Sequence, residues 1–313
     1  MIHLGVAARI LGHVPLSRAG AHQSEAGAHL SVRLLWVIEA LRYLDAHNIR
    51  FYRLPDDLLA PEDRAGTLAD QIAAAAAMLD EVGSYARSAA IRLSMHPHPG
   101  ATPGAASEEA ATRALAHIAS LAALLDALGA GPESVVVVHI GGEGGDCAAA
   151  VERFAVRFER MSPAARRRIA IEPDGERFGL FAALRLHRFT GIPVVFDAFH
   201  FQLRNPERIG LSEALGLALA TWSPGVRPEV HFSTQRTEAH LRRAGHGAPQ
   251  VVAPRAGQHS DFVNPFEFIA FLDAARGLPP FDVMLEAKAA DLALLRLRDD
   301  LRRYAPEYVG WVV

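Results

Sequence analysis

The chain is almost without cysteine, since Cys147 is the only one among its 313 residues. No internal disulfide can form, which suits the reducing cytoplasm. The sequence begins with a strand-like run, IHLGVA, and lacks the basic and apolar regions of a secretory signal. Its apolar runs are shorter than the roughly 20 residues that would cross a bilayer. These absences predict a cytoplasmic protein with no membrane partner.

An excess of positive charge is missing as well. The formal net charge is −3 at pH 7, whereas proteins that bind duplex nucleic acid usually carry a basic surface. The charge argues only weakly against nucleic acid, because divalent cations held by carboxylates would make that face locally positive. Charge therefore leaves both nucleic acid and small molecules open as substrates.

Two common kinds of site are incomplete in this sequence. The glycines of HIGGEGG follow a predicted strand, but no Gly-Lys-Ser/Thr and no full GxGxxG completes a phosphate-binding loop. Cys147 falls at the start of a predicted helix and has no evident base partner for a nucleophilic role. We interpret the glycines as a loop that lets backbone approach a ligand, and the cysteine as a buried spacer.

The chain does contain a regular alternation of short apolar runs and amphipathic stretches, with 50% hydrophobic residues to form a core. The predicted strands are 2–7, 51–54, 91–96, 135–140, 169–172, 193–197, 229–233 and 282–287. The predicted helices are 32–47, 68–89, 107–128, 146–160, 178–190, 211–221, 265–276 and 288–303. Eight such units predict an α/β fold, a (β/α)8 TIM barrel that forms a single domain over residues 1–313. The long connection 233–264 is expected to be functional.

Six potential metal ligands fall at or near the ends of predicted strands: His96, His139, Glu172, Asp197, His231 and Glu286. Because the strand ends of a barrel converge on one face, this pattern predicts a shared metal site at the C-terminal face of the strands. Imidazoles mixed with carboxylates suit Mn, Zn or Fe(II). Glu172 and Asp197 are placed to bridge two ions, and His200 and His259 are candidates for holding a third.

Each of these residues also has a structural interpretation when it is taken alone. A single strand-end histidine such as His139 usually hydrogen-bonds a loop carbonyl, and Glu286 could form an ion pair with Lys288 or an arginine. A lone buried carboxylate would nevertheless be costly without a partner. The joint placement of all six at matching positions favours the metal site.

Seven segments resemble the UV damage endonuclease family, in order and spacing, from about residue 2 to 295: NIRFYRL, RLSMHP, VVVHIGG, VVFDAFH, VHFSTQ, GQHSDFV and DVMLEAK. The resemblance implies a (β/α)8 barrel with two or three divalent ions, most commonly Mn, that cuts damaged duplex DNA 5′ of a lesion. The metal ligands that it implies are His96, His139, Glu172, Asp197, His200, His231, His259 and Glu286.

The sequence departs from the family where the family reads the duplex. After the strand-three histidine the family carries a Gln and an aromatic residue that probe the lesion, and this chain has Pro99 and Gly100. Neither can stack or hydrogen-bond in place of damaged bases. Further family positions are occupied here by Val6, Ile10, Gly144 and Cys147. We therefore expect a divergent member that retains the metal site and has a different DNA-reading surface.

Two residues near the ligands are candidates for proton transfer or for supporting a ligand. Glu229 lies two residues before His231, where the family has a lysine that can be carboxylated, so a carboxylate is retained. Lys288 lies two residues after Glu286. Both are predicted catalytic residues of the metal-dependent hydrolase.

Two other functions remain open from the sequence. The same metal scaffold would suit a small-molecule enzyme, such as a sugar isomerase or epimerase or a metal-dependent oxidase. A narrow, closed pocket would favour that alternative, and an open groove with arginines would favour DNA. A non-catalytic binding protein is disfavoured by the intact ligand set. The oligomeric state is left open.

Overall fold

The protein forms an eight-stranded parallel barrel in the computed structural model, which describes residues 1–13, 29–59, 66–141, 146–242 and 248–313. The barrel strands are β1 (Leu4–Ala7), β2 (Phe51–Leu54), β3 (Arg92–Met95), β4 (Val136–His139), β5 (Ile169–Glu172), β6 (Phe196–Asp197), β7 (Glu229–Phe232) and β10 (Asp282–Leu285). Their order is β5-β4-β3-β2-β1-β10-β7-β6. Ile171 closes the barrel between β5 and β6, because its N–H donates to Pro193 O and its carbonyl accepts from Val195 N, both at 2.8 Å. The predicted barrel is confirmed.

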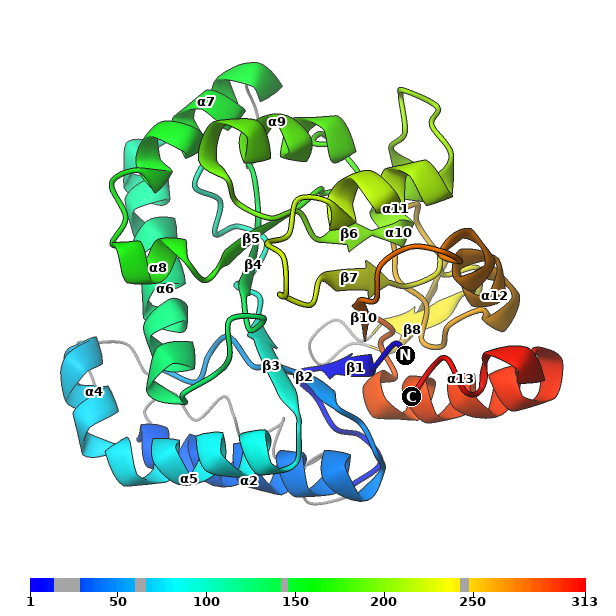
Figure 1. The fold of residues 1–313 in the computed structure, drawn as a ribbon, viewed down its shortest axis with the longest axis horizontal. Helices are drawn as coiled ribbons and strands as arrows, with labels where there is room; N and C mark the ends of the chain where they lie inside the picture. The colour runs from blue at the N-terminus through cyan, green and yellow to red at the C-terminus, as the bar shows by residue number, and fades with distance from the viewer. Residues whose placement is uncertain (14–28, 60–65, 142–145, 243–247) are drawn as a thin grey trace.

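Helices surround the strands, as Figure 1 shows along the shortest axis of the molecule. They are α2 (Leu30–Ala46), α4 (Leu68–Ala74), α5 (Ala76–Ser88), α6 (Glu108–Ala127), α7 (Cys147–Phe158), α8 (Pro163–Arg166), α9 (Leu180–Thr190), α10 (Ala198–Leu203), α11 (Leu211–Leu219), α12 (Pro265–Ala274), α13 (Ala290–Tyr304) and the 3-10 turn η1 (Pro306–Tyr308). Local signals set several ends: Ser107 Oγ accepts from Ala110 N at the start of α6, and Gly191 ends α9 with φ of 75°. Within the described residues, no helix has both the length and the apolar character needed to cross a membrane.

The structure differs from the predicted elements at three places. The helix predicted over 68–89 is divided at Ala75, whose φ and ψ of −105° and 9° leave the helical region. Both parts contact α2 and α6, and α5 packs mainly on α2. The short helices α8 and α10 were not predicted, and β6 keeps only two residues of the run PVVFD.

The barrel interior is apolar on one side and charged on the other. Val135, Val137, Ala170 and Val195 form a small cluster with Trp222 on the side of β4, β5 and β6. The opposite side carries buried polar residues at alternate positions, which share a strand face. They are Arg92 and Ser94 on β3, Glu229 and His231 on β7, and Asp282 on β10. The charged side leads from the base of the barrel to the strand ends.

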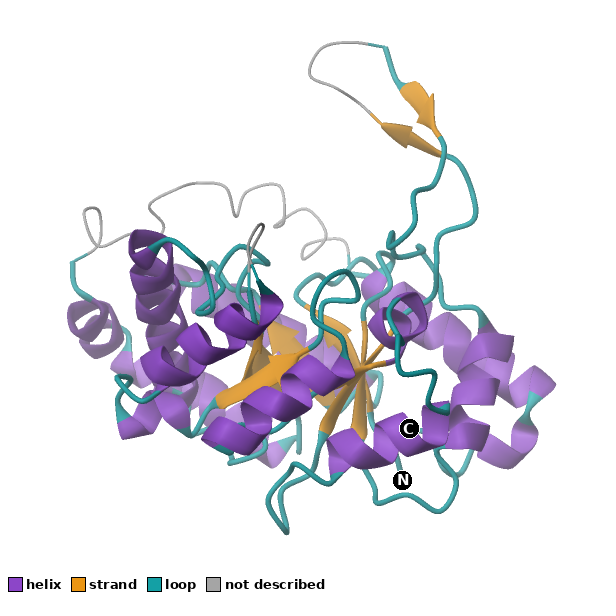
Figure 2. Ribbon diagram, turned by 90° about the horizontal axis from the view of Figure 1, so that it is seen from above, coloured by secondary structure: helices purple, strands orange, loops and turns teal. Residues whose placement is uncertain are grey.

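The long connection after β7 contains a second, two-stranded sheet. Its strands are β8 (His240–Arg242) and β9 (Gln250–Val252), which pair antiparallel. Figure 2 shows this ribbon standing clear of the barrel and of the helices. The sequence predicted a functional segment here, and the structure shows that it is a projecting ribbon.

Asp282 at the start of β10 is expected to stabilise the base of the barrel. Its carboxylate accepts from Arg227 Nε at 2.6 Å, from Arg92 Nη1 at 3.2 Å and from His3 N at 3.2 Å. We expect Asp282→Asn to lower the free energy of unfolding by about 3 kcal/mol at pH 7, because it leaves buried arginine charge unpaired. Urea titration of both proteins measures the difference.

The pH dependence of this difference in unfolding free energy tests whether the charge of Asp282 is its cause. Burial raises the pKa of Asp282, but the hydrogen bond from His3 and the charges of Arg92 and Arg227 outweigh it and lower the pKa. The stabilisation is therefore present above about pH 4, the unfolded value, and is lost as pH falls through the lower folded value. The exposed Asp299, paired only with Arg302, is the matched control, and Asp299→Asn should change nothing measurable. A difference that stays constant down to pH 2 would contradict the prediction.

Candidate metal centre

Strand register brings the predicted ligands together. His139 on β4 is the register partner of Glu172 on β5, and Asp197 on β6 is the register partner of His231 on β7. Glu286 follows β10, where its N–H donates to Phe232 O at 3.0 Å. His96 follows β3 directly. All six residues predicted from the strand ends therefore meet at one end of the barrel.

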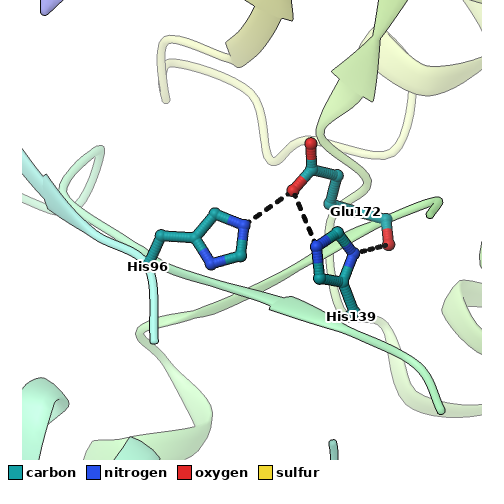
Figure 3. A group of neighbouring side chains, drawn as sticks. All are labelled: His96, His139 and Glu172. Atoms are coloured by element: carbon teal, nitrogen blue, oxygen red, sulfur yellow. Dashed lines mark hydrogen bonds and ion pairs between the residues drawn. The ribbon is translucent and has the colours of Figure 1, made fainter. Parts of the chain in front are cut away.

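The first group of side chains consists of His96, His139 and Glu172, drawn in Figure 3. Glu172 Oε2 lies 2.8 Å from His96 Nε2 and 3.7 Å from His139 Nε2. One potential ligand atom from each residue lies within 4.8 Å of the others. Two imidazole nitrogens and a carboxylate oxygen could therefore hold one metal ion.

The second group consists of Glu172, Asp197, His231 and Glu286, again with ligand atoms within 4.8 Å of one another. His231 Nδ1 lies 2.7 Å from Glu172 Oε1 and 3.5 Å from Glu286 Oε1. Glu172 belongs to both groups and offers one oxygen to each. A carboxylate in this position can bridge two ions, as bridging carboxylates do in two-metal sites.

Four imidazoles are oriented by hydrogen bonds at Nδ1. A carbonyl accepts only, so an Nδ1 that contacts one carries a proton, and Nε2 is then the nitrogen that can bind a metal once it has lost any proton of its own. Carbonyl contacts of this kind hold His96 (Pro97 O, 2.9 Å), His139 (Glu172 O, 3.3 Å) and His200 (Pro173 O, 2.7 Å). His259 Nδ1 contacts the Ser233 hydroxyl (2.7 Å), which can donate or accept, so this contact orients the ring without fixing its tautomer. The carbonyl contact expected for an ordinary strand-end histidine is present at His139, and it is compatible with ligation.

His231 has the opposite orientation. Its Nδ1 faces the second group, while its Nε2 lies 3.1 Å from Glu229 Oε1 and 2.8 Å from Arg53 Nη2. Glu229 is fully buried and also contacts Ser94 Oγ at 3.2 Å and Arg92 Nη2 at 3.4 Å. Glu229 therefore lies below the ligands, in contact with the far side of the His231 ring.

The pKa values of two carboxylates of the cluster are shifted in opposite directions. Burial raises the pKa of Glu172, but the charges of His231 and His139 outweigh it and hold the pKa well below its usual range. Burial also raises the pKa of Asp197, and there the opposing charge of His200 does not outweigh it. Asp197 Oδ1 accepts from His200 N at 2.6 Å, whereas the buried Oδ2 has no hydrogen-bond partner among the described residues. An orphaned buried oxygen on a carboxylate beside the imidazoles of His200 and His231 fits a divalent cation.

His200 and His259 lie beside the two groups without belonging to either. Their ring centroids are 6.2 Å apart, and that of His200 is 6.0 Å from that of His139. Both line the same cavity as the first group. The two histidines that are candidates for holding a third ion therefore lie at the site, next to the residues of the two groups.

The cluster opens into a cavity of about 1120 Å³. This exceeds the upper end of the range usual for small-molecule pockets, about 1,000 Å³. Its wall carries both signs of charge, from Arg53 and Arg177 and from acidic residues that include Asp56 and Glu176. Pro99 and Gly100 lie exposed on this wall, at the positions where the resemblance places lesion-probing residues.

The other sequence candidates that the structure describes are absent from the cavity lining. Val6 and Ile10 are buried in the core, and Gly144 lies outside the described residues. Cys147 is half-buried at the first position of α7, with Sγ 3.7 Å from Arg177 O. Lys288 has an exposed side chain, and its backbone N–H donates to Ser260 O. A proton-transfer role for Lys288 stays a prediction.

The sequence reading missed two buried arginines below the ligands. Arg53 Nη1 donates to Glu286 Oε1 at 2.5 Å, so Glu286 has the arginine partner that was one interpretation of its sequence position. Arg92 bonds Glu229 and Asp282 from within β3. The signal was an arginine inside each of two otherwise buried runs, FYRL and IRLSM, where a charge needs a partner.

Metal binding is expected to release protons. Burial lowers the pKa of His231 and His200, but neighbouring carboxylates outweigh it and raise the two values to about 10 and about 9, chiefly Glu172 for His231 and Asp197 for His200. Both imidazoles are therefore protonated at neutral pH without metal, and an ion must displace a proton from each. We expect Mn affinity to fall as pH is lowered from 8 to 6, with up to about two protons released at full loading. Calorimetry in buffers of different ionisation enthalpy counts them.

Glu172→Gln is the control for this measurement, because it removes the carboxylate shared by both groups and should abolish tight binding of either ion. His187 lies on α9, outside the cavity lining, and its Nδ1 contacts Ile192 O. His187→Ala removes this imidazole and should leave Mn binding unchanged. Mn affinity that does not vary between pH 6 and 8 would contradict the expected protonation of His231 and His200.

Solved structures with the same fold include an endonuclease and several sugar epimerases. The structure described as "Crystal Structure of SacUVDE" has a TM-score of 0.77 at 22% identity, over 97% of this chain and 99% of that one. The apo form of 3-keto-D-glucoside 4-epimerase YcjR from E. coli has a TM-score of 0.57 at 13% identity, over 97% and 98%. At these identities the likeness is one of fold.

Sequence comparison assigns the family. The UV DNA damage endonuclease of Bacillus velezensis is 27% identical over 266 residues, covering 84% of this chain and 78% of the relative. That of Bacillus cereus strain G9842 is 28% identical over 267 residues, with 84% and 79% covered. The family model described as "UV-endonuclease UvdE" matches residues 23–308, far more than half of the chain. The chain therefore belongs to the UV-endonuclease UvdE family.

Proposed function

We propose that the protein is a metal-dependent endonuclease that nicks damaged duplex DNA 5′ of a lesion. Family membership and the names of the Bacillus relatives support DNA damage as the substrate class. The observation that carries the proposal is Glu172, buried between imidazoles of two groups and offering one oxygen to each. A pair of adjacent sites suits hydrolysis of a phosphodiester by metal-activated water, because two ions can stabilise both the attacking and the leaving oxygen.

The two groups would hold two divalent ions, with Glu172 as the bridge. His96 and His139 complete one site, and Asp197, His231 and Glu286 complete the other. The mixture of imidazole nitrogen and carboxylate oxygen suits Mn, with Zn and Fe(II) as alternatives. When bound, such ions lower the pKa of water and stabilise charge on the phosphate. His200 and His259, whose Nδ1 atoms are already engaged, would provide for a third ion.

The residues of the chain prepare this site before any ion binds. Arg53 compensates the charge of Glu286 from below, and hydrogen bonds at Nδ1 hold the imidazoles of His96 and His139 in place. Ligands that are fixed in advance lose less entropy when they bind. On the wall of the cavity, Arg177 lies where it can approach a phosphate.

A small-molecule enzyme on the same scaffold is the less favoured alternative. The epimerase structures share the fold at 10–13% identity, which says nothing of a shared substrate. The cavity of about 1120 Å³ is larger than a monosaccharide needs. The size of the cavity therefore favours a macromolecular substrate.

Nicking should depend on added metal. We expect the Mn-loaded protein to cut duplexes that carry an abasic site or UV lesions, with a chelator abolishing the reaction and Mn restoring it. His139→Ala should slow single-turnover nicking at least about 100-fold at fixed Mn, because it removes a ligand of the first group. Gel analysis of end-labelled duplexes measures the rate and the position of the cut.

His187→Ala is the matched control and should nick at the wild-type rate, since His187 lies on α9 and bonds Ile192 O. An assay for isomerisation or epimerisation of a ketose, run beside the DNA assay, tests the small-molecule alternative. The proposal fails if the protein loaded with Mn, Zn or Fe(II) leaves all damaged duplexes intact.

Glu229 is proposed as a positioning residue for His231. Burial raises the pKa of Glu229, but the hydrogen bond from His231 and the charge of Arg92 outweigh it and lower the pKa, so the carboxylate is ionised. An ionised acceptor keeps the proton of His231 on Nε2 and leaves Nδ1 free for metal. Arg53 Nη2, a donor 2.8 Å from the same nitrogen, favours the opposite tautomer. Glu229 therefore favours the proton on Nε2, so that Nδ1, which faces the second group, can bind the ion.

We expect Glu229→Gln to weaken Mn binding at the second group by about 10- to 100-fold, because a glutamine amide can donate to Nε2 and move the ring proton to Nδ1. Binding at the first group should change less. Titration of Mn with calorimetry separates the two affinities, and the ¹⁵N shifts of His231 in the protein loaded with diamagnetic Zn report which ring nitrogen carries the proton.

Ser94→Ala removes another hydrogen bond of the same carboxylate and is the matched control, with the tautomer of His231 expected to stay as in wild type. If Glu229→Gln weakens both groups equally and leaves the His231 tautomer unchanged, its effect is one of general stability, and the positioning role is wrong.

A further inference from the structure

The ribbon of β8 and β9 is attached to the metal cavity at its foot. One segment leads from β7 to the ribbon, and a second segment returns from the ribbon towards α12. The two segments are joined by hydrogen bonds from Ser260 N to Thr234 O (2.9 Å) and from Arg236 N to Gln258 O (2.7 Å). Gln235 forms a bridge with His259, whose Nδ1 also contacts Ser233 Oγ. Because His259 lines the cavity, the foot of the ribbon forms part of the cavity wall.

The ribbon carries an apolar pair away from the core. Leu241 and Val251 are direct register partners, so their side chains lie on the same face of the ribbon. They are 69% and 75% exposed, the highest values among the exposed large hydrophobic residues of the described chain. Burial of these side chains therefore contributes little to folding. A two-stranded ribbon is marginally stable by itself, so two large aliphatic side chains at this place need another explanation.

The charge of the same segment is opposite to that of the chain. Residues 235–258 contain four arginines and one acidic residue, Glu238, for a net charge of +3, whereas the whole chain carries −3. Arg236 pairs with Glu238 and Asp261, while Arg255 is exposed at the foot. A basic projection beside a cavity complements a polyanion better than it complements a second copy of this acidic chain.

The dimensions suit a duplex that lies across the cavity. The seven residues from Gln235 to Leu241 are joined by six steps and span at most about 20 Å, which corresponds to roughly six base steps along DNA. A two-stranded ribbon fits a DNA groove, and aliphatic side chains inserted at a base step unstack it and kink the duplex. The reach would place the apolar pair on the duplex a few steps from the phosphate at the metal centre.

From these observations we infer that the ribbon is a DNA-distorting arm, with Leu241 and Val251 inserted against a base step of the duplex whose phosphate lies at the metal centre. The inference rests on the proposed endonuclease function. It assigns to the ribbon the contact with unstacked bases for which Pro99 and Gly100 have no suitable side chain.

The test compares the wild type with Leu241→Ser/Val251→Ser on an abasic duplex that carries 2-aminopurine at successive positions within about six steps of the lesion. Single-turnover nicking at increasing protein concentration gives the half-saturating concentration, and stopped-flow fluorescence reports unstacking before the cut. We expect the double variant to need at least about tenfold more protein, since burial of two aliphatic side chains is lost, and to lose the fluorescence rise.

Two further variants keep the result interpretable. Leu241→Met/Val251→Ile retains apolar side chains and should behave as wild type, which shows that the ribbon tolerates substitution. Val156→Ser/Phe189→Ser removes two comparably exposed apolar residues from α7 and α9, at 56% and 53%, and should also behave as wild type. If this pair weakens DNA binding as much as the ribbon variant, the effect belongs to apolar surface in general and the inference is overturned.

The remaining outcomes also decide the inference. Half-saturation within twofold of wild type, with the fluorescence rise intact, overturns it while the proposed function stands. A wild-type dimer that the ribbon variant dissociates, with DNA affinity unchanged, assigns the pair to a second copy of the chain and overturns it as well. A wild type that neither binds nor nicks any damaged duplex defeats the endonuclease proposal itself, before any variant is compared.

Discussion

Buried charge inside a closed barrel is the constraint on which this structure depends. Glu172, Asp197 and Glu229 are each at most 1% exposed, and an isolated carboxylate in such a place is strongly disfavoured. Arg92 and the imidazole of His231 compensate Glu229 and Glu172, but Asp197 Oδ2 remains without a partner among the described residues. In the proposed function, divalent cations would complete the compensation.

The same compensation connects the base of the barrel to the site. Asp282 at the start of β10 contacts Arg92, Arg92 contacts Glu229, and Glu229 contacts the inner side of the His231 ring. Each group in this series limits the orientation of the next, because a buried ion pair holds only in good geometry. A ligand of the metal centre is thereby positioned from the opposite end of the strands, and changes at the base affect the site without touching it.

The proposed ligands and the residues that differ from the family lie on different kinds of segment. The ligands occupy strand ends, where the barrel fixes their position, while Pro99 and Gly100 occupy a loop that can change without disturbing the barrel. The ribbon of β8 and β9 belongs to another such loop, and its foot joins the cavity at His259. In the proposed function, recognition of the duplex would move from one loop to another while the barrel holds the proposed ligands in place.

The sequence by itself determined the barrel and the positions of the ligands, because the period of apolar runs fixes the strands and parallel strands end on one face. The proximity of His139 and Glu172 was predicted from the sequence pattern alone, and strand register confirms it. Arg53 and Arg92 were visible as arginines in buried runs, but their partners Glu286 and Glu229 lie far along the chain and meet them only when the barrel closes. The direction of the His231 ring and the exposure of Leu241 and Val251 were likewise decided by tertiary structure, since each depends on contacts between distant segments that no local pattern encodes.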